Sequence, residues 1–163
     1  MKRSKSAMAT ERMWLREIDE TDGDCIVRLR SDEDVYRYFL NPVKLTIQDH
    51  LRWYKETYCN DRGRIDWIAV DDENGDFIGV YGAKISGEKG AEISYITAKE
   101  QRGRGYAKEA VEAVMNWCEK KWDISLFYVL IHVDNKASIS FARQIGFSES
   151  DENGAFVRMI RKG

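Results

Sequence analysis

Apolar and polar positions follow two periods along this chain, one typical of strands and one typical of helices. Short runs rich in β-branched and aromatic residues predict strands, and apolar residues three and four positions apart predict helices. Three successive strands are joined by short turns, so the pattern predicts an α+β domain that contains an antiparallel meander. The expected strands cover residues 13–18, 64–70, 77–85, 91–97 and 126–133, and a terminal strand or hairpin surrounds Asn153-Gly154.

Along the chain, the predicted helices both precede and follow the meander. Two short helices precede it, the second with Thr46 as a candidate N-cap. The aromatic-rich segment 34–40 between them is ambiguous. Two more follow the meander: a long amphipathic helix after Gly105, and one that Asn135 begins and Gly146 closes.

Composition places the chain among ordinary globular proteins. Of its 163 residues, 43% are hydrophobic and 33% are charged, and the net charge is −2. This length suits one domain, expected over residues 12–163 behind a flexible tail at 1–11. The near-neutral charge gives no reason to expect nucleic acid or a membrane as a partner. Neither a signal peptide nor an apolar run of membrane-spanning length is seen, so a cytoplasmic location is expected.

Histidine and cysteine are too sparse to suggest a metal site. His50 and His132 are the only histidines, and Cys25, Cys59 and Cys118 lie far apart without ligand spacing. Their odd number favours reduced thiols over a disulfide framework. We therefore expect neither a bound metal nor a structural disulfide.

A glycine-rich turn between the meander and the long helix is the strongest functional signal. The sequence Arg102-Gly103-Arg104-Gly105-Tyr106-Ala107-Lys108 places two glycines and three cationic side chains where the helix begins. Glycine lets the backbone approach a ligand closely, and the free N–H groups of a first helical turn attract anions. The pattern predicts a pyrophosphate site.

Two common pyrophosphate motifs do not fit this turn. The dinucleotide-binding sequence G-x-G-x-x-G needs a glycine where Lys108 stands, and it belongs to a parallel βαβ unit, not to an antiparallel meander. The G-x-x-x-x-G-K-[ST] loop of nucleoside triphosphatases is absent from the sequence. The pyrophosphate of another ligand is therefore expected.

The residues resemble a known family. Arg102-x-x-Gly105-x-Ala107 matches the [RQ]-x-x-G-x-[GA] acetyl-CoA-binding motif of the GCN5-related N-acetyltransferases (GNAT). The segment 135–147, which ends in Gly-Phe, is similar to that family's second signature, and the order of elements agrees from Trp14 onwards. Within the superfamily the chain looks like the branch that includes ribosomal-protein N-acetyltransferases. His50-Leu51-Arg52-Trp53-Tyr54 is also similar to enzymes that acetylate nucleotide-linked amino sugars.

The resemblance implies a fold and an acetyl donor. The GNAT fold has a mixed, mostly antiparallel sheet that splays between its fourth and fifth strands and is flanked by about four helices. Acetyl-CoA would pair with the backbone of a bulged strand at the splay, and an N–H near Tyr95 would polarise the thioester carbonyl. The residues implied in binding acetyl-CoA are Tyr95, Ile96, Thr97, Arg102, Gly103, Arg104, Gly105, Tyr106, Ala107, Lys108, Asn135, Ser138 and Phe141.

Two residues are candidates for the general base that deprotonates an ammonium before attack. Glu92 lies in the third meander strand, where some relatives carry a carboxylate that acts through water; otherwise it is a surface glutamate. His132 stands at a strand position where several relatives carry a catalytic glutamate, and imidazole suits proton transfer near neutral pH. Otherwise it is a packed or cofactor-side histidine.

The general acid departs from the family pattern, because Ala142 stands where many relatives have a tyrosine. Ser138, one helical turn earlier, is the candidate that would protonate the leaving thiolate; otherwise it is a helix-face hydroxyl near CoA. Asn135 is expected to bind the pantetheine arm, to cap its helix, or both. The side chains of Arg104 and Lys108 contact phosphate or lie in solvent.

These features predict an acetyl-CoA-dependent N-acetyltransferase in which a primary amine attacks the thioester directly, since no cysteine lies in either signature. The acceptor is an amino-sugar nucleotide, a protein N-terminus or a small amine, and the enzyme is a monomer or a homodimer. The alternative is a non-catalytic module that binds acyl-CoA. Candidate acceptor contacts, which otherwise belong to a solvated face or to the core, are Asp32, Glu33, Asp34, Tyr36, Tyr38, Trp53 and Tyr54.

Overall fold

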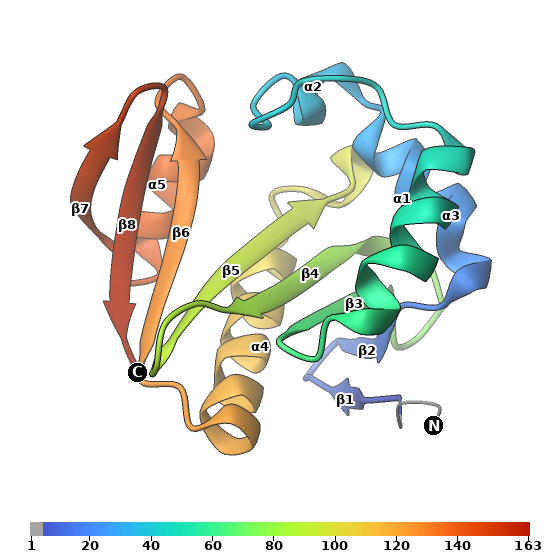
Figure 1. The fold of residues 1–163 in the computed structure, drawn as a ribbon. Helices are drawn as coiled ribbons and strands as arrows, with labels where there is room; N and C mark the ends of the chain where they lie inside the picture. The colour runs from blue at the N-terminus through green and yellow to red at the C-terminus, as the bar shows by residue number, and fades with distance from the viewer. Residues whose placement is uncertain (1–4) are drawn as a thin grey trace.

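The computed structural model describes residues 5–163 and shows one mixed sheet with helices on both faces (Figure 1). The sheet has eight strands in the order β1-β2-β3-β4-β5-β6-β8-β7, and only β5 and β6 pair in parallel. The predicted α+β fold is confirmed. The strands are β1 (Ala7–Ala9), β2 (Met13–Glu17), β3 (Arg64–Asp71), β4 (Phe77–Ile85), β5 (Gly90–Thr97), β6 (Leu126–His132), β7 (Ser148–Asn153) and β8 (Phe156–Lys162).

Two hydrophobic clusters join the helices to opposite faces of the sheet. On one face, Ala110, Val111 and Val114 of α4 are fully buried in a large cluster that also includes residues of α5. On the other face, Ile26 of α1 packs with Ile68 of β3 in a smaller cluster. The helices are α1 (Gly23–Arg30), α2 (Glu33–Tyr36), α3 (Ile47–Glu56), α4 (Tyr106–Trp122) and α5 (Lys136–Gln144), with short 3-10 turns η1 (Glu20–Asp22), η2 (Tyr58–Asn60) and η3 (Lys99–Gln101).

Strands β5 and β6 separate after three residue pairs, the last of which joins Glu92 to Tyr128. On its other edge β5 stays paired with β4 as far as Thr97. The backbone of residues 93–97 that faces β6 is therefore left without a strand partner. The expected splay is confirmed (Figure 1). The expected bulge in this strand is wrong, because the β4–β5 ladder keeps one register throughout; the irregularity lies between β3 and β4, at Ala69/Val70.

The N-terminal segment differs from the expected flexible tail at 1–11. Residues 1–4 lie outside the described residues, but Ala7–Ala9 form β1 and pair with β2. Thr10 Oγ1 and Arg12 N then donate hydrogen bonds of 2.6 and 2.8 Å to the Glu109 carboxylate on α4. The free edge of β2 and the Glu109 carboxylate thus order this segment. Its strand is too short to show a hydrophobic period in the sequence.

The helices that carry the site follow local signals in the sequence. Thr46 caps α3, since its Oγ1 accepts the N–H of Asp49 at 3.1 Å. The ambiguous segment 34–40 becomes the end of α2 and a loop that leads toward α3. Across residues 5–163, no helix combines the length and apolar character needed to cross a bilayer.

Candidate active site

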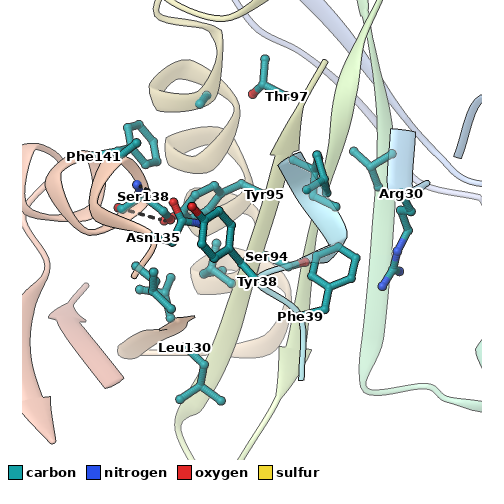
Figure 2. A pocket seen from close by; sticks show the side chains of 18 of the residues that line it. Arg30, Tyr38, Phe39, Ser94, Tyr95, Thr97, Leu130, Asn135, Ser138 and Phe141 are labelled. Atoms are coloured by element: carbon teal, nitrogen blue, oxygen red, sulfur yellow. Dashed lines mark hydrogen bonds between the residues drawn. The ribbon is translucent and has the colours of Figure 1, made fainter. Parts of the chain in front are cut away.

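A cavity of about 1070 Å³ fills the splay between β5 and β6. One end reaches the glycine-rich turn, and the other lies beside α1 and the segment 34–41. Figure 2 shows Ser138 and Phe141 of α5 on one side and Arg30 of α1 on the other, with Tyr95 and Ser94 of β5 between them. One continuous space therefore connects the glycine-rich turn to the helices where the acceptor is expected.

The glycine-rich turn presents free backbone donors to one end of the cavity. Gly103 and Gly105 have φ values of +77° and +81°, in the left-handed region that favours glycine. The N–H groups of residues 103–105 donate to no atom within residues 5–163. Helix α4 begins at Tyr106 and adds the free N–H groups and dipole of its first turn. This geometry suits a pyrophosphate.

The cationic side chains of the turn divide into two groups. Arg102 and Lys108 are exposed and line the cavity, and Arg102 Nε donates to the Thr97 carbonyl at 3.1 Å. Arg104 instead donates to Gln101 Oε1 at 3.2 Å and is the one predicted binding residue that does not line the cavity. Arg12 Nη1 donates to the Arg104 carbonyl at 2.8 Å and ties the turn to the start of β2.

A pair of hydroxyl groups joins β5 to α5 in the splay. The Tyr95 hydroxyl lies 2.7 Å from Ser138 Oγ, and the Tyr95 ring meets Phe141 edge to face with centroids 4.9 Å apart. Burial raises the pKa of Tyr95 to about 12, so its hydroxyl stays protonated at neutral pH. Asn135 Oδ1 accepts the Ser138 N–H at 3.3 Å and caps α5, as expected, while its Nδ2 has no partner within residues 5–163.

The two candidate bases differ in their surroundings. Burial raises the pKa of the Glu92 carboxyl, although the charges of Arg64 and Lys84 act in the opposite direction. His132 packs against two aromatic rings, and its Nδ1 accepts the Asp134 N–H at 3.1 Å. A neutral His132 then carries its proton on Nε2, which leaves it without a free nitrogen lone pair.

Ala142 is fully buried in the core and does not line the cavity. The position at which the family resemblance leads one to expect a tyrosine is therefore closed off from the cavity in this chain. Ser138 of α5 and Tyr95 of β5 do line the cavity, and their hydroxyl groups contact each other there.

The acceptor end contains residues that the sequence did not single out. Arg30, Phe39, Arg64, Asp66 and Ser94 all line the cavity. Helical spacing gives one signal for Arg30, which follows the buried Ile26 by one turn and so shares its face. Of the acceptor candidates, Asp34, Tyr38 and Trp53 line the cavity, whereas Asp32, Glu33, Tyr36 and Tyr54 do not. His50, from the segment that resembles amino-sugar enzymes, is buried and does not line the cavity.

Metal-ligating side chains do not gather here. Within the described part of the chain, no group of three or more His, Cys, Asp and Glu residues has an arrangement that could hold an ion. Cys25, Cys59 and Cys118 are free thiols, and none of them lines the cavity.

A family model described as "Acetyltransferase (GNAT) domain" matches residues 12–148. The chain belongs to the GNAT acetyltransferases. The acetyltransferase is 30% identical to YkkB of Bacillus subtilis (strain 168) over 154 residues, which cover 90% of this chain and 88% of YkkB. It is 25% identical to the N-acetyltransferase YoaA of the same organism over 148 residues, which cover 87% and 82% of the two chains.

Solved structures share the fold of this acetyltransferase. A spermidine N-acetyltransferase from Vibrio cholerae, in complex with CoA and spermine, superposes with a TM-score of 0.81 at 20% identity and covers 92% of this chain and 95% of its own. A domain from Methanocaldococcus jannaschii DSM 2661 gives a TM-score of 0.81 at 18% identity and covers 96% and 99%. The GNAT fold expected from the two signatures is confirmed.

Proposed function

We propose that this N-acetyltransferase transfers the acetyl group of acetyl-CoA to a primary amine by direct attack in a ternary complex. The observation that carries the proposal is the single cavity with a backbone anion site at one end and titratable and aromatic side chains at the other. Such a space holds donor and acceptor at once. The spermidine N-acetyltransferase fold supports a small amine as the acceptor class.

The donor end fits the chemistry of CoA. The free N–H groups of residues 103–105 and the first turn of α4 would hold the pyrophosphate. The unpaired backbone of residues 93–97 offers an edge along which the pantetheine amides can pair like an added strand. Asn135 Nδ2 is free to donate to the same arm.

Glu92 is proposed as the general base. It is the last residue of β5 that pairs with β6 before the splay, and it lines the cavity. A raised pKa brings a carboxylate closer to the basicity that proton removal from an ammonium requires. His132 is the weaker candidate, because its Nδ1 already accepts a backbone N–H.

Ser138 is proposed as the general acid, and Tyr95 is proposed as the residue that returns a proton to Ser138. The amine nitrogen forms a bond to the carbonyl carbon, a backbone N–H near Tyr95 polarises the carbonyl, and the carbon–sulfur bond breaks. Ser138 Oγ donates its proton to the departing sulfur, and the Tyr95 hydroxyl passes its own proton to Ser138 through their hydrogen bond. The proton removed by Glu92 returns to solvent, and solvent restores Tyr95.

Direct transfer agrees with the placement of the cysteines. A covalent acetyl-enzyme would need a nucleophile in the cavity, and no thiol lines it. Cys118 is buried in α4, where burial raises the pKa of its thiol to about 12 and keeps it protonated.

The proposal is tested by incubating the protein with acetyl-CoA and a panel of amines. Release of free thiol and the mass of the acetylated amine are measured together. Thiol release in equal amount to product supports the enzyme. Tight CoA binding without turnover across the panel supports the non-catalytic alternative.

A further inference from the structure

Arg30 brings a positive charge to the acceptor end of the cavity without a carboxylate to balance it. It is the last residue of α1, it is partly buried, and it lines the cavity. Its guanidinium lies 4.9 Å from the centroid of the Phe39 ring and makes neither a hydrogen bond nor an ion pair with any of residues 5–163. Burial lowers the pKa of this guanidinium, although Asp66 acts in the opposite direction.

The nearby carboxylates are already paired with other cations. Arg64 Nε donates to Asp66 Oδ2 at 2.9 Å. The Asp66 carboxylate also lies against the β4 backbone, so close that a Cβ on Gly82 would be 2.0 Å from Asp66 Oδ1. Asp34 forms ion pairs of 3.6 Å with Arg37 and with Lys99. Within residues 5–163, Arg30 is therefore the cation of this group that has no carboxylate partner.

The aromatic contact gives Arg30 a defined direction. A guanidinium that stacks on a ring keeps its N–H donors in its own plane, at the edge. Arg64 has the same arrangement over Trp53, with its Cζ 4.9 Å from the ring centroid. Planar N–H forks of this kind match the two oxygens of a carboxylate or phosphate.

Resting on the proposed acetyl transfer, we propose that the acceptor is a small amine that also carries an oxyanion, and that Arg30 binds this oxyanion. Arg30 lies across the cavity from Ser138 and Phe141 (Figure 2). An acceptor anchored there would extend its amine toward β5 and the splay. Arg30 acts as a specificity-determining residue and takes no part in the proton transfers.

The same charges disfavour a polyamine. A polyamine brings several ammonium groups, and each would meet Arg30 or Arg64 in a partly desolvated space where repulsion is weakly screened. The two aspartates that line the cavity, Asp66 and Asp34, are held by other cations, which leaves Glu92, within the described part of the chain, as the one lining carboxylate for several ammonium groups. Fold similarity to a spermidine N-acetyltransferase thus supports a small amine but not a polyamine as the acceptor.

The test compares matched pairs of acceptors with the full-length protein. One set pairs amino acids with the amines formed by their decarboxylation, a second pairs aminoalkylphosphonates with the corresponding alkylamines, and spermidine represents polyamines. The expected result is a kcat/KM at least about tenfold higher for the oxyanion-bearing member of one set, as charge-assisted hydrogen bonds predict. The set that shows the preference identifies the oxyanion as a carboxylate or a phosphonate.

Variants assign the preference to Arg30. Arg30→Gln is expected to abolish it, mainly by raising KM for the oxyanion-bearing amine while leaving KM for acetyl-CoA unchanged. Arg30→Lys keeps the charge but loses the fork, so part of the preference remains. Arg28→Gln is the matched control, because Arg28 is an exposed residue of the same last turn and does not line the cavity.

The outcomes separate this inference from the proposed function. Acetylation with no preference, a preference for spermidine, or a preference that survives Arg30→Gln would overturn the inference and leave acetyl transfer intact. If acetyl-CoA binds and no amine of any set is acetylated, the proposed function fails and the inference fails with it.

Discussion

The hydroxyl oxygen of Tyr95 lies 2.7 Å from Ser138 Oγ, and this hydrogen bond links β5 to α5 where the sheet opens. The two residues are 43 positions apart, so the sequence places them together only through the fold. Ala142 is buried in the core and offers no hydroxyl to the cavity. This pair of hydroxyl groups is the proposed source of the proton that the leaving thiolate takes up.

Removing either hydroxyl is expected to slow the departure of the thiolate. Ser138→Ala should lower kcat at least about tenfold, and Tyr95→Phe should lower it less, because Ser138 keeps its own proton. The double variant should be no slower than Ser138→Ala, since the two residues act in one chain. Steady-state kinetics measure all three. Ser140→Ala, an exposed residue of the same helix, is the control, and a normal kcat for Ser138→Ala would make solvent the proton source.

Glu92 should set the acidic limb of the pH–rate profile. Because burial raises the pKa of its carboxyl, kcat/KM should rise with pH through a range above that of an exposed glutamate. Glu92→Gln should remove this limb and lower kcat/KM by about 100-fold at neutral pH. The candidates are compared by pH–rate profiles of Glu92→Gln and His132→Gln. Glu88→Gln is the control, because Glu88 is an exposed residue of the turn between β4 and β5. A limb lost only in His132→Gln would transfer the role of base to the histidine.

Gly105→Ala should weaken the binding of CoA by more than backbone strain alone would cause. Gly105 and Gly154 have φ values of +81° and +62°, so alanine at either position should cost about 1–2 kcal/mol of stability. Only Gly105 belongs to the proposed pyrophosphate turn; Gly154 lies in the β7–β8 hairpin. Calorimetric titration with CoA should show weaker binding for Gly105→Ala and unchanged binding for Gly154→Ala. Equal losses in both variants would contradict the assignment of this turn.

Tyrosines that are buried or half-buried should make the protein sensitive to alkali. Burial raises the pKa values of Tyr54, Tyr81 and Tyr95 from 10.0 to about 12, so the unfolded chain releases these protons first. The free energy of unfolding should be constant with respect to these groups below pH 10 and should fall as pH rises from about 10 to about 12. Denaturant titrations across this range measure the slope. Tyr81→Phe should make it shallower, and a slope that this variant leaves unchanged would contradict the account.

The sequence predicts the meander and α4 well because their signals are local. The observed β3, β4 and β5 differ from the predicted ranges by at most one residue, and the turn that follows them contains both glycines at positive φ. Strand β1 is not predicted, because three residues are too few to show the alternation of apolar and polar positions that is typical of a strand. Its order depends on the free edge of β2 and on Glu109, which lies about a hundred residues away.

The acceptor end could not be predicted for a different reason. Whether the Arg30 side chain reaches solvent or a cavity depends on how α1 packs on the sheet and on where the Phe39 ring, which Arg30 contacts, is placed. In the same way, Arg104 and Lys108 look equivalent in the sequence, but the contact with Gln101 removes only Arg104 from the cavity lining. Packing gives these chemically similar side chains different surroundings. The order of residues along the chain does not show this difference.

Initial rates with acetyl-CoA and an accepted amine both varied test the central claim most directly. Direct attack in a ternary complex predicts double-reciprocal lines that intersect, and intact-protein mass spectrometry should show no acetylated enzyme in the absence of amine. Parallel lines together with an acetylated enzyme would contradict the account, because they require a covalent intermediate for which the cavity provides no cysteine.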